Sequence, residues 1–392
     1  MRKQNWQTAL NRFGAVITAA GLPFTHLLGY IGLGTATVCG QWINLLKDRK
    51  FVRIIFPMVL FVGYIGIRVI FVDERAPGLA TFGNFLANWL IPFAIGYANG
   101  FIIHKLLRIY IYSFAILIVI GLLSAAGILP HIIFGEKVWF EGMLWCFHHH
   151  NALASMLIIV LSLSFFTGNY RKLTFWITPL FILAFFLTGS RGYLIAFPVL
   201  LFGLFYETLK SRKKMEGIVL AISLIIFTLA AFAVPTIRYR IQTITAGGWK
   251  TEIPALSRFG FWEIGKLAFA ESPIFGIGPG QLRVRKDLLQ KAEKYGLPID
   301  EKSGKVRHLH NFYITILAED GVIGIFLLLW TLYVLGKSLY LKKGLSAKFI
   351  WAYYAILIGN MFDSQLRGPS GAIDLFFIMG LLISNGESNK PR

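Results

Sequence analysis

Acidic residues and cysteine are scarce in this chain of 392 residues. Asp and Glu number 19 against 39 Lys and Arg, and the only two cysteines are Cys39 and Cys146. We expect the two cysteines near opposite faces of the protein, which excludes a disulfide framework and a metal–thiolate site. The basic surplus does not favour nucleic-acid binding, because no stretch outside the apolar runs is large enough for a known reader fold.

Apolar residues are abundant by contrast, at 56% of the chain, with a mean hydropathy of +0.64. They form runs long enough to cross a hydrocarbon layer of about 30 Å, and a chain in lipid satisfies its own backbone as helix. The runs fall near residues 12–28, 29–45, 54–72, 79–102, 107–128, 151–167, 173–188, 193–208, 216–234, 312–334, 346–361 and 371–385. The sequence therefore predicts an all-α, polytopic integral membrane protein of about twelve transmembrane helices, with residues 1–392 as a single membrane domain.

Basic residues cluster at the N-terminus and after every second run. These clusters are Arg2 and Lys3; Lys47, Arg49, Lys50 and Arg53; Lys105 and Arg108; Arg171 and Lys172; Lys210, Arg212, Lys213 and Lys214; Lys337, Lys342 and Lys343; and Lys390 and Arg392. With twelve spans all of them lie on one side, and short basic loops favour the cytoplasm. We therefore predict a multi-pass protein with both termini cytoplasmic. The N-terminus lacks a cleavable small-residue site, so we expect its first apolar run to be retained.

One segment outside the runs is much longer than the others, at residues 235–309. It lies between the ninth and tenth runs, on the predicted periplasmic side, and carries 13 Lys and Arg against 7 Asp and Glu. Amphipathic stretches at Phe259–Phe269 and Asp287–Tyr295 predict a helical cap rather than an unstructured loop. Its positive charge favours a phosphorylated ligand, because guanidinium groups bind phosphate oxygens with charge-assisted hydrogen bonds. Solvation of a loop near anionic lipid is the alternative reading.

Three residues near the predicted outer surface are candidates for chemistry. Arg191 stands in the turn between the seventh and eighth runs, and ionisable groups at a membrane-buried cleft are functional candidates. Arg258 begins the first amphipathic stretch of the long segment, and His310 begins the tenth run, two residues after His308. A histidine with an ordinary pKa near about 6.5 suits general-base work. An ordinary hydrogen-bonded surface histidine is the alternative for His310.

The run His148, His149 and His150 is conspicuous but does not indicate a metal site. Three consecutive helical residues point about 100° apart, so they cannot all hold one ion. The common metal patterns place two histidines three or four positions apart, and these patterns are missing from the sequence. We predict no metal and no other cofactor, and we assign the three histidines to the lining of the cleft.

Asp363 and Arg367 lie in the predicted outer loop between the last two runs. Asp363 is a candidate to orient a histidine or an arginine at the site, and Arg367 a candidate to bind substrate. An ion pair between the two residues, spaced i and i+4, is an equally good interpretation.

A family resemblance follows from these residues. The segment HNFYITILAEDGVIG, from His310 to Gly324, resembles the signature of O-antigen ligases and polymerases: His, then Asn, Ser or Gln, nine residues, Gly, two residues, Gly. The segment from Arg258 to Gly280 is similar to the one that precedes this histidine in the superfamily. TGSRG, at 188–192, resembles the family's arginine turn. The likeness covers roughly residues 170–370.

The resemblance implies a GT-C-like fold and an inverting, metal-independent glycosyltransferase of the cell inner membrane, acting in lipopolysaccharide biosynthesis. Its substrates would be O-antigen on undecaprenyl pyrophosphate and a sugar hydroxyl of lipid A–core oligosaccharide, at a site that faces the periplasm. Arg191 and Arg258 would be the essential arginines, holding the pyrophosphate, and His310 would be the base or would orient the acceptor. Asp363 would be the acidic residue near the C-terminus. We predict His308, Asp363 and Arg367 as further substrate-binding residues.

Three alternatives remain at this stage. An O-antigen polymerase uses the same donor, but polymerases often have two large outer loops, where this chain has one dominant loop. An O-linked protein oligosaccharyltransferase usually carries an additional soluble C-terminal region. A transporter of an anionic solute is the non-enzyme alternative, but transporters tend to show internal symmetry and charged mid-membrane helices.

Overall fold

The computed structural model describes residues 2–38, 42–140, 142–166, 171–211, 217–218, 220–222, 225, 253–293 and 309–384, which are mostly helical. The longer helices are α1 (Arg2–Gly21), α2 (His26–Val38), α4 (Arg49–Arg68), α5 (Arg75–Phe85), α6 (Ile91–Ala98), α7 (Ile103–Ala125), α8 (His150–Phe166), α9 (Arg171–Leu187), α10 (Arg191–Ser211), α13 (Ile253–Glu271), α14 (Lys286–Glu293), α15 (Phe312–Tyr340), α17 (Ile350–Gly359) and α18 (Pro369–Ser384). The short ones are α3 (Trp42–Lys47), η1 (Val69–Phe71), η2 (Leu86–Leu90), η3 (Gly100–Ile102), η6 (Gln281–Arg283), α16 (Leu345–Lys348) and η7 (Gln365–Arg367).

The helices follow the apolar runs closely, which confirms a mostly helical membrane protein. Within the described ranges, five helical stretches are long and apolar enough to cross a membrane: Arg49–Phe71, Arg75–Ala98, Gly100–Ala125, Arg191–Lys210 and Phe312–Tyr340. Shorter apolar helices are His150–Phe165, Ile177–Leu187, Leu345–Gly359 and Gly371–Ser384. The count of twelve spans stays a prediction, and most of the run at 216–234 lies outside the described residues.

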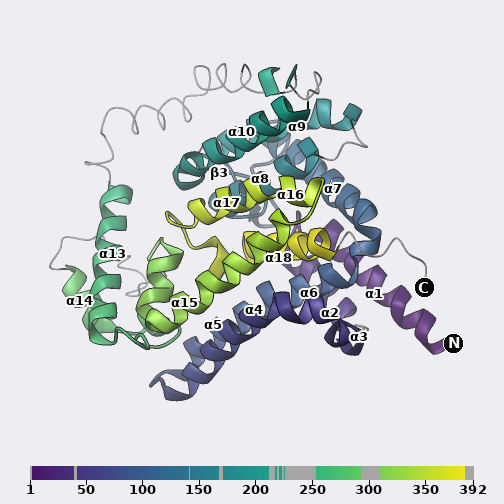
Figure 1. Ribbon diagram of the computed structural model, residues 1–392. Helices are drawn as coiled ribbons and strands as arrows, with labels where there is room; N and C mark the ends of the chain where they lie inside the picture. The colour runs from purple at the N-terminus through teal and green to yellow at the C-terminus, as the bar shows by residue number, and fades with distance from the viewer. Residues whose placement is uncertain are drawn as a thin grey trace.

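Helices α8 and α18 form the centre of the molecule. Every side chain from Asn151 to Phe165 in α8 is buried, and so is every residue from Gly371 to Ile383 in α18. A helix that is apolar all round needs protein on all sides, and α8 and α18 pack against each other and against α6, α7, α9, α10 and α17. Figure 1 shows α10, α17, α15 and α4 as roughly parallel layers around this centre, with α13 standing across one end.

The outer helices expose apolar stripes in place of polar ones. On α15 the residues Val322, Phe326, Leu329 and Tyr333 are each between 50% and 63% exposed, at helical spacings of four, three and four. An aqueous surface rarely carries so continuous an apolar face, whereas lipid requires one. These stripes mark the faces that contact the bilayer.

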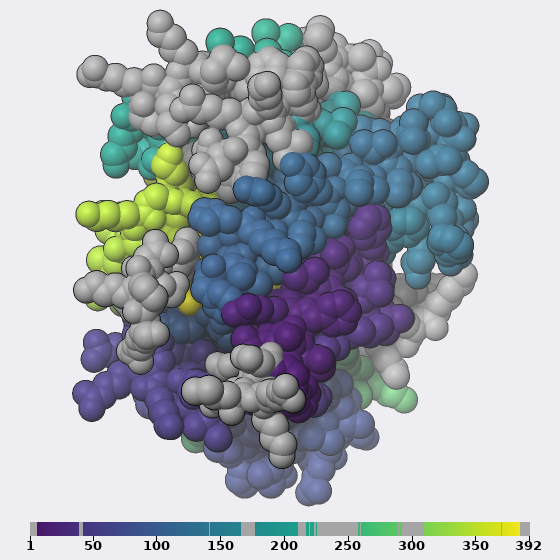
Figure 2. Space-filling model, turned by 90° about the vertical axis from the view of Figure 1, so that its right-hand side faces the viewer, coloured from purple at the N-terminus to yellow at the C-terminus, as the bar shows by residue number. Residues whose placement is uncertain are grey.

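The two N-terminal helices form a hairpin that packs on α6 and α7, seen as the dark purple band across the face in Figure 2. The interruption at Gly21-Leu22-Pro23 ends α1, and α2 begins only at His26. The hairpin is tight because Gly14 and Gly32 face each other: a Cβ on either glycine would collide with the partner helix. The first two helices therefore begin earlier in the chain than the predicted runs at 12–28 and 29–45.

Between α7 and α8 the chain forms two small hairpins, which the sequence analysis did not predict. Strand β1 (Ile132–Ile133) pairs with β2 (Glu136–Lys137), and β3 (Trp139–Phe140) pairs with β4 (Met143–Leu144), both antiparallel. The first turn has Phe134 at φ 52° and Gly135 at φ 78°, as a two-residue hairpin turn requires. Strands can form here because this connection is not part of an apolar helix, so its backbone groups need not make all their hydrogen bonds within one helix.

The long segment at 235–309 is described from residue 253 to 293 and at residue 309. The first amphipathic stretch is helical within α13, and the second is helical as α14 up to Glu293, where the described residues end. A small apolar cluster holds this part to the start of α15, and it comprises Ile264, Ala268, Leu282, Leu288, Leu309 and Ala318. That this segment is a cap on the periplasmic side stays a prediction.

Candidate functional site

His310 lies at the point where the long segment becomes α15. The next residue, Asn311, caps the helix by accepting a hydrogen bond from the Ile314 amide at 3.0 Å. His310 itself has φ 49°, in the left-handed region that an ordinary residue adopts at a cost. The Phe312 amide fixes the bend, because it donates to the carbonyl oxygens of Asn360 at 2.9 Å and Asp363 at 3.0 Å. The His310 side chain is thus presented by a backbone that two chain segments hold together.

Asp363 faces this histidine from the connection between α17 and α18. Its Oδ1 lies 3.9 Å from His310 Nδ1, with the carboxylate side chain 6% exposed and the imidazole 34% exposed. The carboxylate is held in place, since Oδ1 accepts from the Ser364 amide at 2.8 Å and Oδ2 from Gln365 Nε2 at 2.9 Å. The histidine and the carboxylate therefore face each other at a distance that allows electrostatic attraction but is longer than a hydrogen bond.

Arg191 and Arg258 reach the same place from two further helices. Arg191 is the first residue of α10 and follows a turn at Gly189, which has φ 62°. Arg258 lies on α13, and its pKa is lowered, first by burial and then by the positive charge of Arg191, while Asp363 acts in the opposite direction. The two guanidinium groups and the carboxylate are therefore close enough to influence one another. Two cations share one carboxylate, which leaves a positive site.

The pKa of His310 is lowered by the same surroundings. Burial is the largest cause; Arg258 and His149 lower the pKa further, and Asp363 raises it. A lowered pKa keeps the imidazole neutral at pH 7, so one ring nitrogen retains a lone pair able to accept a proton. The ring of Phe261, on α13, lies 5.6 Å from the His310 ring, centroid to centroid, and forms an apolar wall beside it.

His149 belongs to this group, although the sequence singled it out only as one of three adjacent histidines. Its pKa is lowered by burial and by Lys137, and raised by Asp363. His148 turns the other way: its Nε2 lies 2.8 Å from the Pro23 carbonyl oxygen, and its ring stacks on His26. The three histidines are not consecutive helical residues, because α8 begins only at His150. His149 and His150 lie together, with ring centroids 4.4 Å apart, and only His148 points elsewhere. Among the residues that the structure describes, no group of three or more His, Cys, Asp or Glu is arranged to hold a metal ion.

Arg367 takes a different partner from the one considered above. It is 3% exposed and forms an ion pair with Glu319 Oε2, on α15, at 2.5 Å, and it also lies 3.3 Å from Thr81 Oγ1. The interpretation of an ion pair between Asp363 and Arg367 is therefore wrong, because Asp363 faces His310 and Arg367 turns toward α15. A role for Arg367 in binding substrate stays a prediction, and His308 lies outside the described residues.

The two glycines of the signature have a structural reason. Gly321 has φ 66° and ψ −165°, which breaks α15, and the turn after α13 docks into the break. The amides of Ile277 and Gly278 donate to the carbonyls of Ala318 and Glu319 at 3.0 and 2.8 Å. A Cβ on Gly321 would collide with the carbonyl of Ile274 in this turn, and a Cβ on Gly324 would collide with Asp320.

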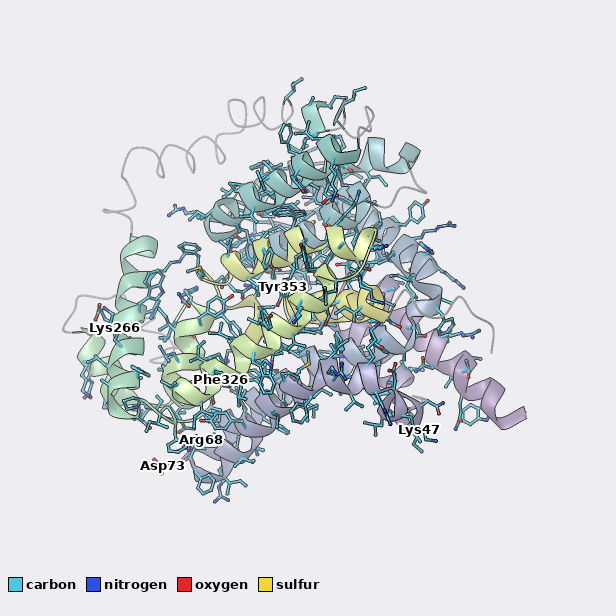
Figure 3. All side chains as sticks on the ribbon, in the orientation of Figure 1. Lys47, Arg68, Asp73, Lys266, Phe326 and Tyr353 are labelled. Carbon is cyan, nitrogen blue, oxygen red and sulfur yellow. The ribbon has the colours of Figure 1, made fainter. Side chains whose placement is uncertain are left out.

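Helix α4 supports the docked turn from the other side. Arg68 Nη2 donates to the Gly276 carbonyl at 3.0 Å, and Tyr64 Oη donates to the Asp320 carbonyl at 2.9 Å. Figure 3 shows Arg68 at this end of α4, near Phe326 of α15. The helix that carries Arg258 and the helix that follows His310 are thus locked together.

An apolar groove of about 980 Å³ runs along α15 and α17 from the neighbourhood of His310. Asn311, Tyr313 and Met361 line it at the His310 end, and Lys337, Tyr340 and Leu341 line the far end. Two tyrosines join the helices beneath it: Tyr313 Oη donates to the Leu357 carbonyl at 2.9 Å, and Tyr353 Oη to the Leu332 carbonyl at 2.6 Å. The groove has the apolar walls and the length that a lipid chain requires.

These features define a mostly helical membrane protein with a positive, histidine-containing site next to a lipid-accessible groove. Residues 176–329 match the sequence model of the family described as O-Antigen ligase. Arg191, Arg258 and His310 all lie within the matched segment, whereas Asp363 lies beyond it. No curated protein matches the chain. Members of the family are glycosyltransferase-like ligases or polymerases.

Proposed function

We propose that this protein is an O-antigen ligase, which transfers the glycan from undecaprenyl pyrophosphate to a sugar hydroxyl of lipid A–core oligosaccharide. One observation carries the proposal. Arg191, Arg258, His310 and Asp363 come from four separate segments of the chain and share electrostatic surroundings at one place. The reaction requires three things: stabilisation of a diphosphate leaving group, activation of a weak hydroxyl nucleophile, and binding of a lipid anchor. The site has residues suited to each of them.

The arginines are suited to stabilise the leaving group. As the bond between the anomeric carbon and the phosphate oxygen breaks, negative charge grows on the pyrophosphate. Arg191 and Arg258 are placed to balance this charge, and their planar groups match phosphate oxygens with paired hydrogen bonds. They stand near each other before substrate binds, although their charges repel, so the stabilising groups need no rearrangement during the reaction.

His310 and Asp363 are suited to activate the acceptor hydroxyl. With a proton on Nδ1 directed toward Asp363, the Nε2 lone pair of His310 accepts the proton of the acceptor hydroxyl. The hydroxyl oxygen then attacks the anomeric carbon from the side opposite the pyrophosphate, which inverts the configuration there. The lowered pKa of His310 supports this role, because a protonated imidazole could not accept the proton.

The groove between α15 and α17 is suited to bind the lipid anchor. It begins beside Asn311, next to the histidine, and is lined mainly by apolar side chains and tyrosines. A polyprenyl chain in this groove would hold the attached pyrophosphate at the end where the arginines lie. The basic clusters in the short loops support both termini in the cytoplasm of the inner-membrane protein, with the site and the cap at 235–309 on the periplasmic face.

Purified full-length protein, supplied with donor and acceptor lipids with and without a metal chelator, tests the reaction. We expect glycosylated lipid A–core in both cases, none from the His310→Ala protein, and full activity from a His131→Ala control. Product formation by the His310→Ala protein at the normal rate would contradict the proposed mechanism. Dependence on a metal would overturn metal-independent transfer.

Lipopolysaccharide from a deletion strain separates the ligase from the polymerase. A ligase deletion leaves polymerised glycan on its lipid carrier and no glycan on the core. A polymerase deletion leaves the core with a single repeat unit, and that result would contradict the proposal.

A further inference from the structure

A second groove, of about 760 Å³, lies between α4 and the last part of α15, and it shares Tyr333, Lys337 and Leu341 with the far end of the first groove. The residues that line it are Leu46, Arg49, Val52, Arg53, Ile54, Phe56, Pro57, Trp330, Tyr333, Val334, Lys337, Ser338 and Leu341. Lys337 follows Phe312 by 25 residues, which is about 38 Å along a helix. The groove therefore lies at the opposite end of α15 from His310. Figure 3 shows the same separation along α4: Arg68 is the last residue of α4, and Lys47, which ends α3, lies two residues before its start.

Three cations meet at this groove. Arg49 and Arg53 are one helical turn apart on α4, and Lys337 reaches the groove from α15. Like charges at i and i+4 repel each other, and no acidic side chain is among the residues that line the groove. This arrangement is unfavourable by itself and becomes favourable when an anion lies between the charges.

The nearest carboxylate along α4 is already engaged. Asp48 Oδ1 caps α4 by accepting from the amides of Lys50 and Phe51 at 2.9 and 3.3 Å. Its Oδ2 accepts from Tyr97 Oη at 2.9 Å. Both carboxylate oxygens of Asp48 therefore already accept hydrogen bonds, one from the start of α4 and the other from Tyr97 of α6.

The rest of the groove is apolar and continues along the membrane-facing side of both helices. Phe56 of α4 and Trp330 of α15 meet edge to face, with ring centroids 6.1 Å apart. Val52 and Tyr333 lie between these rings and the cations, and both are exposed. A ligand that fits has an anionic head and an apolar tail, which is the chemistry of an acidic phospholipid.

We propose that this groove is a binding site for an anionic membrane phospholipid, with its phosphate between Arg49, Arg53 and Lys337 and its acyl chains over Phe56 and Trp330. Basic pockets between transmembrane helices bind such headgroups, and the attraction adds with each cation. The position of the cations at one end of two membrane-spanning helices places the phosphate at headgroup level. This proposal does not depend on the proposed function.

The bound lipid bridges α4 and α15 at one end. The same two helices are joined at the other end through Tyr64 and Arg68, which hold the turn docked at Gly321. An anionic lipid therefore completes a pair of contacts that keeps α15 aligned. We expect it to raise the melting temperature of the protein.

The test uses the purified, delipidated full chain, titrated with phosphatidylglycerol, phosphatidylcholine or inorganic phosphate. Bound lipid is counted by native mass spectrometry, and the melting temperature is measured in parallel. We expect phosphatidylglycerol to bind and stabilise the protein, and the other two to do neither at the same concentration. In the Arg49→Gln/Arg53→Gln protein the dissociation constant for phosphatidylglycerol rises about 25-fold, at about fivefold for each cation. Lys337→Gln raises it about fivefold.

The matched control is Lys105→Gln/Lys210→Gln, which removes two exposed cations from α7 and α10 and should leave binding unchanged. Equal binding of phosphatidylcholine would overturn the proposal, as would an unchanged dissociation constant in Arg49→Gln/Arg53→Gln. Stabilisation by inorganic phosphate alone would show an ion site and not a lipid site. If the double variant does not fold, Lys337→Gln gives the same test from the other helix.

Discussion

Helix α15 carries two charged groups of opposite character, one at its start and one in its middle. At the start, His310 and Asp363 stand 3.9 Å apart, the imidazole is 34% exposed, and two arginines add positive charge nearby. In the middle, Arg367 and Glu319 are 2.5 Å apart and almost fully buried, at 3% and 0% exposure. The first group is partly exposed and contains two arginines, while the second is buried and pairs Arg367 with Glu319, next to the buried Asp320 carboxylate.

This contrast suggests that one group serves ligand binding and the other serves the stability of the fold. A buried ion pair contributes little net stability, but removal of one partner leaves an uncompensated charge. A partly exposed group has less desolvation to offset, so its side chains can be replaced at a smaller cost to the fold. Substitutions in the middle of α15 should therefore reduce stability, and substitutions at its start should reduce turnover with the fold intact.

The largest effect is expected from His310→Ala. Loss of the proposed general base should lower the rate of glycan transfer by about 10²–10⁴-fold, with little change in melting temperature. Initial rates with purified donor and acceptor measure the first quantity, and a thermal melt measures the second. A strong loss of stability together with activity would remove the contrast between the two groups.

Arg367→Met should act on stability instead. The buried Glu319 carboxylate would lose its partner, at a cost of about 3–5 kcal/mol in the free energy of unfolding. The double variant Glu319→Leu/Arg367→Met removes both charges and should recover most of that loss. If the single variant is as stable as the unmodified protein, the buried pair is not the structural element described here.

Arg258→Lys keeps the positive charge but loses the planar, paired hydrogen bonds. We expect a fall of up to about 10²-fold in turnover, at the lower end of the range for the loss of one stabilising donor. Arg285→Lys is the control, because Arg285 belongs to the same segment but pairs with Glu271 and Asp287. Equal activity of both variants would assign Arg258 to bulk charge only.

The pH dependence of transfer sharpens the assignment of His310. The lowered pKa of His310 keeps its ring neutral at pH 7. The transfer rate should therefore stay constant as the pH falls through about 6.5, the ordinary histidine pKa. At lower pH, once the ring is protonated, the rate should fall about tenfold per pH unit. Asp363 raises the pKa of His310, so Asp363→Asn should move this acid limb to lower pH. A limb that moves to higher pH would contradict the electrostatic contact between the two residues.

The smallest effect concerns Asn311. Its side chain caps α15, so Asn311→Ala should cost about 1 kcal/mol of stability. Asn311→Ser retains a capping oxygen and should recover part of this loss. A large fall in activity in the serine variant, with stability retained, would instead give Asn311 a direct part in the reaction.

The sequence predicted most of the helices because their signal is local. Apolar runs mark membrane helices without any knowledge of their neighbours, and α4, α7, α10, α15 and α18 begin within five residues of the predicted runs. The hairpins at β1–β4 were missed because two-residue strands have no periodicity to detect. The break at Gly321 was also missed, since it depends on a docked turn from another part of the chain.

The candidate site was only partly predictable, for the same reason. Arg191, Arg258 and His310 had local signals: a turn, the start of an amphipathic stretch and the family signature. The pairing of Arg367 with Glu319 could not be predicted, because Glu319 lies 48 positions away in the chain. His149 had no signal besides two adjacent histidines, and only the folded chain brings it near Asp363.

The break in α15 has a consequence for how the protein is made. Gly276 precedes Gly321 by 45 residues, so the turn leaves the ribosome before the helix that receives it. In the folded protein the amides of Ile277 and Gly278 donate to the carbonyls of Ala318 and Glu319, beside the break. Because the turn is synthesised first, these two amides are available as soon as α15 has been made.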